Sequence, residues 1–170
     1  MTQYKGEMPP VCPYCGAKST LWPDSHVYRR GYDSKVWCCD NWPVCDSYVG
    51  VHPDTNIPLG RLANKELRNN RIAYKRVFNF LWQDAMKSKR YSKGKARTAA
   101  YRWLAEQLQI KQEDCHFGWW DNDMVIKAGM ICINWVNSQP SLLARAKLKI
   151  MDHQNILMNA GLDLRITRVK

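Results

Sequence analysis

Two short stretches decide the fold: VCPYCGAK (residues 11–18) and CCDNWPVCDSY (residues 38–48). The first stretch carries a Cys-x2-Cys pair among turn-forming residues. The second carries three cysteines, of which Cys39 and Cys45 form a Cys-x5-Cys pair around Pro43. Zn²⁺ takes four thiolates in a tetrahedron, and two short cysteine turns that face each other supply them. Four thiolates leave no open coordination position, so the ion is structural rather than catalytic. We predict one structural zinc held by Cys12, Cys15, Cys39 (or its neighbour Cys38) and Cys45.

Disulfide bonds are the alternative interpretation of these cysteines. Residues 1–11 lack the apolar core of a secretion signal, and a reducing cytoplasm disfavours structural disulfides. No apolar run reaches the ~18 residues that a membrane span requires. We therefore expect a cytoplasmic protein without a membrane partner, in which the cysteines bind zinc. A second metal site at Cys115, His116, Cys132 and His153 is a weaker alternative, because a thiol on an apolar helix face is usually a buried core residue.

The 170 residues suit one globular domain with a small metal-stapled module, since 45% are hydrophobic and 24% charged. We predict an α+β fold, in which an N-terminal four-cysteine zinc ribbon precedes an all-helical module of about four helices. Turn-forming residues separate the two parts. The predicted divisions are a ribbon at 9–52, a connector at 53–60, a helical module at 61–161 and a tail or edge strand at 162–170.

Within these divisions, alternation and helical spacing locate the elements. Short strands are expected at 20–22, 26–28, 36–38 and 48–51. Helices are expected at 61–86, at 98–109, after a cap at Asp121 or Asn122, and at 140–160. The apolar positions on these helices predict a core of Leu67, Phe78, Leu81, Trp103, Leu104 and Trp135.

The net charge of +11 is concentrated in residues 53–110, which hold thirteen Lys or Arg and four Asp or Glu. On the helix at 61–86 the basic side chains fall on one side, and they continue into a basic segment at 87–97, which we expect to be a loop or a frayed helix end. A merely solvated face would mix the two signs of charge. The pattern favours an acidic partner, above all DNA or RNA. The candidate contacts are Arg61, Lys65, Arg68, Arg71, Lys75, Lys89, Arg90, Lys93 and Lys95.

Aromatic residues accompany this charge. Trp22, Trp37 and Trp42 in the ribbon and Tyr91 in the loop could stack on unpaired bases. Aromatic side chains in so small a ribbon more often form its core, which is the alternative interpretation. The sequence contains no Walker A loop, no H-E-x-x-H and no G-x-S-x-G motif, so we expect a binding protein rather than an enzyme.

The second cysteine turn, CDNWPVC (39–45), resembles the C-x-x-Y-P-x-C half of the zinc ribbons at the C-terminal end of bacterial type IA topoisomerases. Trp42 stands at the aromatic position, and the resemblance covers about residues 10–50. It implies a surface for single-stranded DNA. It also favours Cys39 as the third ligand, with Cys38 packed as a small hydrophobe. Apart from the resemblance, His52 is a weaker substitute ligand.

A longer resemblance runs over about residues 10–125, through YVGVHPDTNIPLGRLANKELRNNRIAYKRVFNFLW, AYRWLAEQL and CHFGWWD. These strings are similar to small zinc-finger-containing proteins of bacteriophages and prophages. The resemblance implies a zinc ribbon fused to helices and a phage protein acting in the bacterial cytoplasm, without an established activity.

Two functions use the same basic residues. The first is nucleic-acid binding of low sequence specificity, because no helix presents a set of base-reading Asn, Gln and Arg side chains. The alternative is a phage effector that binds and inhibits an acidic host protein, such as RNA polymerase or a defence nuclease.

Overall fold

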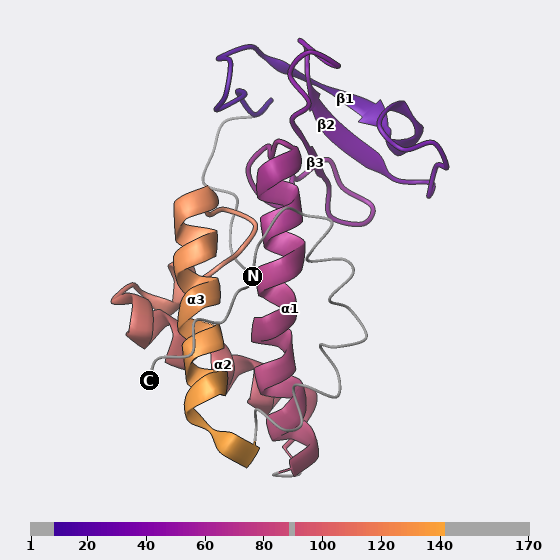
Figure 1. Ribbon diagram of the computed structural model, residues 1–170. Helices are drawn as coiled ribbons and strands as arrows, with labels where there is room; N and C mark the ends of the chain where they lie inside the picture. The colour runs from indigo at the N-terminus through magenta and orange to yellow at the C-terminus, as the bar shows by residue number, and fades with distance from the viewer. Residues whose placement is uncertain (1–8, 89–90, 142–170) are drawn as a thin grey trace.

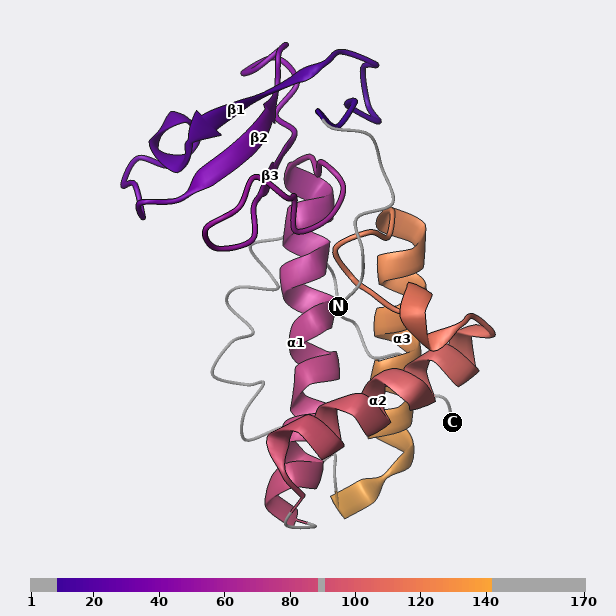
Figure 2. The same cartoon turned by 180° about the vertical axis from the view of Figure 1, so that it is seen from behind.

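A three-stranded antiparallel sheet forms the N-terminal part of the computed structural model, which describes residues 9–88 and 91–141. Its strands lie in the order β1 (Ser19–Pro23), β2 (Lys35–Cys39) and β3 (Tyr48–Gly50). In register, Leu21 of β1 faces Trp37 of β2, which faces Val49 of β3. Figures 1 and 2 show this sheet standing at one end of the helical part. The predicted α+β architecture is confirmed.

Three α-helices make up the rest of the described chain: α1 (Lys65–Ser88), α2 (Lys93–Leu108) and α3 (Asn122–Ser138). Helices α1 and α3 run side by side, and α2 crosses them at the end away from the sheet (Figures 1 and 2). The expected count of about four helices is therefore three within these residues. The expected fourth helix and the tail at 162–170 lie, beyond Ser141, outside the described residues. No helix in the described part is both long and apolar enough to span a bilayer.

The first helix begins at Lys65 rather than at Arg61 as expected. The backbone before it is used elsewhere: Ala63 pairs with Tyr48 of β3 in an isolated bridge, and the Arg61 N–H donates to the Gly118 carbonyl (2.9 Å). The cap is Asn64, whose Oδ1 accepts from the Leu67 N–H at 2.9 Å. Tertiary pairing thus displaces the helix start by one turn.

The basic segment at 87–97, expected to be a loop or a frayed helix end, is mostly helical. Helix α1 continues to Ser88 and α2 begins at Lys93, five residues before the expected start. Ser92 caps α2 by accepting from the Lys95 N–H at 3.3 Å, and Ala96 is buried in the core. The Ser92 cap and the burial of Ala96 stabilise the first turn of α2 by more than the repulsion among its positive charges destabilises it. Lys89 and Arg90 lie outside the described residues.

Two smaller expectations had different outcomes. The cap of α3 is Asp121, whose Oδ1 accepts from the Met124 N–H at 2.9 Å, as predicted. The strand expected at 26–28 is wrong, because Asp24 folds this region into a turn that includes the short 3-10 helix η1 (Asp24–His26). The buried Asp24 carboxylate accepts from the Tyr32 N–H (2.9 Å) and the Ser34 hydroxyl (2.8 Å), which closes the loop between β1 and β2.

The helical core centres on Phe78, Leu67 and Leu104, which are all buried as predicted. Leu81 and Trp103 pack against it and are partly buried. Trp135 is 44% exposed, so its assignment to the core is wrong. Phe117 and Trp120 take that role from the segment between α2 and α3: the Phe117 ring centroid lies 5.5 Å from that of Phe78 and 4.8 Å from that of Trp120.

Two glycines allow close backbone approach. A Cβ atom on Gly129 of α3 would overlap the ring of Tyr74 on α1, so this glycine permits the two helices to pack closely. A Cβ atom on Gly60 would overlap the backbone of Gly118, where the connector meets the α2–α3 segment. The connector is also tied to the sheet, since the Leu59 N–H donates to the Gly50 carbonyl at 2.8 Å.

Candidate functional site

Four sulfur atoms gather at the end of the sheet. The Sγ atoms of the four cysteines all lie within 4.8 Å of one another, with 3.4 Å between Cys15 and Cys39 and 3.6 Å between Cys12 and Cys45. Zn–S bonds of ~2.3 Å in a tetrahedron place sulfurs roughly 3.8 Å apart. The donor set and its spacing therefore fit one structural zinc ion, as predicted.

Local turns bring the two cysteine pairs into position. In the first turn the Gly16 N–H donates to the Cys12 carbonyl (3.0 Å), and Gly16 has φ of 72°, a left-handed conformation that glycine adopts without strain. In the second turn the Cys45 N–H donates to the Asn41 carbonyl at 2.9 Å. Cys39 belongs to the cluster, whereas Cys38 is fully buried outside it. Neighbouring residues of a strand point to opposite faces, so β2 can direct one of these two thiols to the metal.

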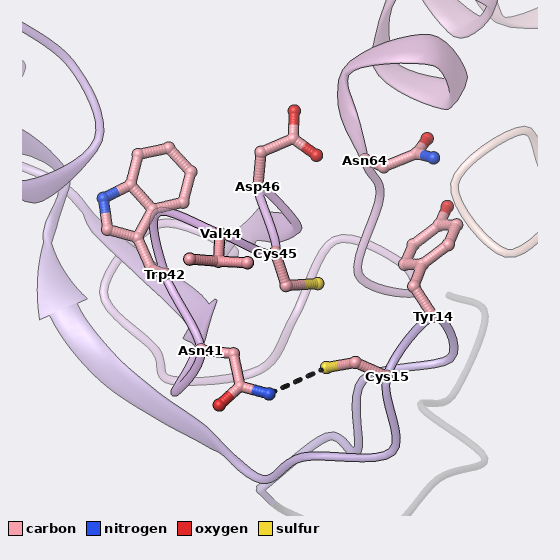
Figure 3. Close-up of a pocket in the computed structure, with 8 residues that line it drawn as sticks. All are labelled: Tyr14, Cys15, Asn41, Trp42, Val44, Cys45, Asp46 and Asn64. Carbon is pink, nitrogen blue, oxygen red and sulfur yellow. Dashed lines mark hydrogen bonds between the residues drawn. The ribbon is translucent and has the colours of Figure 1, made fainter.

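Polar groups surround the sulfurs. The buried Ser47 hydroxyl lies 3.0 Å from Cys12 Sγ and 3.3 Å from Cys45 Sγ. The Asn41 Nδ2 donates to Cys15 Sγ at 3.5 Å (Figure 3). The Ala17 backbone N–H lowers the pKa of Cys15 to about 7, whereas burial raises the pKa of Cys39 to about 12. Metal binding must therefore displace a proton from the buried thiol, and the polar contacts favour the thiolates that result.

The metal centre is joined directly to α1 through Asp46, the residue after Cys45. One Asp46 carboxylate oxygen accepts from the Lys65 backbone N–H at 3.0 Å and pairs with Arg68 at 3.2 Å. Arg68 also donates to the backbone carbonyls of Asp46 and Ala63, and its guanidinium lies 3.9 Å from the ring centroid of Tyr48. Arg68 was predicted as a nucleic-acid contact, and the structure places it in the junction between ribbon and helix.

Arg71 occupies a second internal position. Its guanidinium donates to the carbonyls of Gly118 (2.8 Å) and Trp120 (3.0 Å), and burial lowers its pKa to about 10. The other candidate contacts are placed differently. Lys65, Lys93 and Lys95 are exposed, Lys75 and Arg61 are partly buried, and Lys89 and Arg90 lie outside the described residues.

A shallow depression of about 460 Å³ runs along the outer side of α1, lined by Arg71, Ile72, Lys75, Arg76, Asn79 and Gln83. The pKa of Lys75 is lowered by burial and then by the neighbouring cations Arg97 and Arg71. Burial also lowers the pKa of His116, with further lowering by four basic neighbours: Lys75, His52, Arg71 and Arg97. Cations from α1 and α2 thus gather around the imidazole of the α2–α3 segment.

Sequence reasoning did not include Arg76, Arg97 or His116 among the contacts. The helical spacing already placed Arg76 on the basic face, so that signal was available. Arg97 joins the cluster because α2 starts at Lys93, and His116 joins it through the packing of the α2–α3 segment. Neither of these two placements follows from local sequence.

Comparison with known proteins gives one match. No curated protein and no solved structure matches the chain. A family model described as a zinc-finger-containing domain matches residues 8–134. This span is more than half of the chain, and it includes the four-cysteine cluster, α1, α2 and most of α3. The chain therefore belongs to this family of zinc-finger-containing domains.

Proposed function

We propose that this protein binds nucleic acid with low sequence specificity through the cationic surface of α1 and the start of α2. The observation that carries the proposal is the gathering of Arg71, Lys75 and Arg97 beside the imidazole of His116, where burial first and the neighbouring cations second lower the pKa of both Lys75 and His116. Such a concentration of positive charge attracts a phosphate backbone, which relieves the repulsion among the cations.

The basic residues serve either folding or binding. Arg68 and Arg71 direct their guanidinium groups to backbone carbonyls and to Asp46, so they hold α1 in place. Lys65, Lys93, Lys95 and Arg97 are exposed and can reach phosphates. Flexible cations contacting a backbone recognise charge rather than base sequence, which supports low specificity.

The zinc ribbon acts in this proposal as a rigid support, since the metal is structural and Asp46 couples it to the first turn of α1. We propose a binding protein rather than an enzyme. The resemblance to zinc-finger-containing proteins of bacteriophages and prophages supports the cytoplasm of a bacterial host as its place of action, where both DNA and RNA are available.

A salt titration of binding to random-sequence DNA and RNA tests the proposal. Replacing Lys65, Arg76 and Lys95 together with glutamine should weaken binding to all sequences alike. The slope of log affinity against log salt concentration should fall by about 0.9 for each phosphate of duplex DNA that the variant no longer neutralises. A matched triple replacement of Arg102, Lys111 and Lys127, which lie on α2, in the α2–α3 segment and on α3, should leave the slope unchanged.

The absence of binding to DNA and RNA at ~50 mM salt would contradict this function, because phosphate contacts are strongest at low salt. The alternative, a phage effector acting on an acidic host protein, would then be tested by capture from nuclease-treated bacterial lysate. Loss of that capture in the first triple variant, and not in the second, would assign the cationic surface to a protein partner.

A further inference from the structure

We infer that the hollow between the two zinc-binding turns and the start of α1 is a binding site for one unpaired nucleobase. This inference rests on the proposed function and deepens it, because it names the form of nucleic acid that the protein binds. The hollow has a volume of about 660 Å³, within the range of small-molecule sites, and Figure 3 shows the side chains around it.

Aromatic and aliphatic side chains form part of the wall of the hollow. Tyr14 and Trp42 stand on opposite sides of it, with Val44 between them (Figure 3). Tyr14 is 42% exposed and Val44 is 96% exposed, so neither contributes much to the ribbon core. Flat aromatic side chains beside an exposed aliphatic group offer the faces on which a base can stack.

Two amides at the edge of the hollow are held in fixed orientations. The Nδ2 of Asn41 donates to Cys15 Sγ at 3.5 Å, which leaves its carbonyl oxygen as an acceptor and its second N–H as a donor. The Oδ1 of Asn64 accepts from the Leu67 N–H at 2.9 Å, so the group that Asn64 can offer is its NH₂ donor. Together the two amides offer both acceptor and donor groups, which suit the mixed hydrogen-bonding edge of a nucleobase.

The charge of the hollow favours a base over a phosphate. Four thiolates around one Zn²⁺ carry two net negative charges, and the Asp46 carboxylate that also lines the hollow is already paired with Arg68. This environment repels a phosphate but accepts a neutral ring. The cations lie just outside: the backbone of Lys65 bonds to Asp46, and its exposed side chain starts from the rim. A base in the hollow can therefore have its phosphates on α1.

The base must be unpaired, because a paired base presents neither its two faces nor its hydrogen-bonding edge to a protein pocket. Stacking between a base and an aromatic side chain contributes ~1–3 kcal/mol. The structure therefore makes two separable demands on a ligand: a phosphate chain for the cations of α1 and α2, and a free base for the hollow of the ribbon.

The test compares two single strands of equal length and charge, an oligodeoxycytidine and an abasic strand, with a duplex as the third ligand. Fluorescence anisotropy on the full zinc-loaded chain should show the oligodeoxycytidine binding about tenfold or more tightly than the abasic strand, given stacking of this size. Tyr14→Ser and Val44→Ser should each reduce that ratio. Val11→Ser is the matched control, since Val11 is a 63% exposed valine beside a ligand cysteine but outside the hollow.

Zinc content is measured for every variant, and the comparison of strands on the unaltered protein stands even if one variant loses its metal. Equal binding of the oligodeoxycytidine and the abasic strand would overturn the nucleobase site while leaving phosphate binding by α1 and α2 intact. An equal reduction of the ratio by Val11→Ser would overturn the location. Binding of neither strand would overturn the proposed function as well.

Discussion

The ribbon and the helical module are held together by different forces. The ribbon core consists of Cys12, Cys39, Val49 and Leu62, two of which are metal ligands. Within the described part of the chain, the helical core has fifteen buried residues, with Phe78 among them. So small an apolar cluster as that of the ribbon cannot offset the conformational entropy of its chain, whereas the helical core can contribute in the usual way. One chain thus uses metal coordination where apolar area is scarce and packing where it is plentiful.

Removing the metal should produce the largest loss of stability, because the ribbon depends on zinc and the helices do not. Structural zinc contributes an apparent ~10–16 kcal/mol in small zinc-finger peptides. Cys12→Ser or Cys45→Ser should therefore unfold the ribbon while the helices persist, as seen by zinc analysis, circular dichroism and limited proteolysis. A ribbon that keeps its protease resistance in excess chelator would contradict this dependence.

The adjacent thiols give this experiment an internal control. Cys39→Ala should abolish zinc binding, because its sulfur lies in the cluster, whereas Cys38→Ala should retain one zinc per chain. Retention in Cys39→Ala with loss in Cys38→Ala would reverse the assignment of the third ligand.

Truncating the helical core should give the next largest loss of stability. This loss should fall on the helical module and leave the ribbon folded. Phe78 is 0% exposed, so Phe78→Ala should lower the free energy of unfolding of the module by ~3–5 kcal/mol. Zinc should remain bound. Trp135→Ala, at a 44% exposed position, is the comparison and should cost clearly less. A decrease under ~1 kcal/mol for Phe78→Ala in urea unfolding would show that Phe78 is not the centre of the core.

The junction tests whether the two regions unfold together. Arg68→Gln removes the ion pair with Asp46 and the stacking on Tyr48, and it should cost about 1.5 kcal/mol, since the pair is partly exposed. It should also separate the unfolding of ribbon and helices into two transitions. Lys65→Gln, at an exposed position of the same helix, should change stability by under ~0.5 kcal/mol. Identical unfolding curves for the two variants would remove Arg68 from the junction.

The smallest effect is a pH dependence of the stability of the helical module, which arises from His116. Burial lowers the pKa of His116, with further lowering by the nearby cations Lys75, His52, Arg71 and Arg97. Below about pH 6.5 the unfolded chain takes up a proton that the folded chain resists, so stability falls with pH down to the pKa of the folded state. The slope cannot exceed ~1.4 kcal/mol per pH unit for one proton.

Urea unfolding between about pH 8 and about pH 5.5 measures this slope, since the range brackets the usual pKa of histidine. The neutral imidazole also accepts from the Gly118 N–H through Nδ1 at 3.1 Å, which protonation would remove. His116→Gln should flatten the curve relative to the unaltered protein, and this difference separates His116 from protonation of the zinc ligands. An unchanged slope in that variant would assign the pH dependence elsewhere.

The parts of this molecule that sequence could predict are those set by local chemistry. The cysteine turns follow from ligand spacing, and the cap at Asp121 follows from its place before an apolar helix. The early start of α2 was missed because positive charge suggested a loop, while Ser92 and the burial of Ala96 favour a helix. The positive charge of this segment favoured a loop, whereas the Ser92 cap favoured a helix, and the packing of Ala96 into the core decided for the helix.

Long-range contacts explain the rest. A helical wheel puts Arg68 and Arg71 on the basic face, but their guanidinium groups bond to Asp46 and to Gly118, which are 22 and 47 residues distant in sequence. The hollow in the ribbon likewise combines Tyr14 and Trp42 with Asn64, from three separate segments. Such combinations depend on the folded arrangement, and the sequence pattern does not contain them.

The contact between Asp46 and α1 has a practical consequence for protein engineering. A fragment that stops at His52 would keep the four cysteines of the metal cluster but lack two residues that contact Tyr48. Ala63 exchanges two backbone hydrogen bonds with Tyr48 (3.1 and 3.2 Å), and Arg68 covers the Tyr48 ring. The fragment would also lack Leu62 in its core. The unit that can be transplanted is therefore the ribbon together with the first two turns of α1. A graft that ends there keeps Arg68, which covers the Tyr48 ring of the sheet.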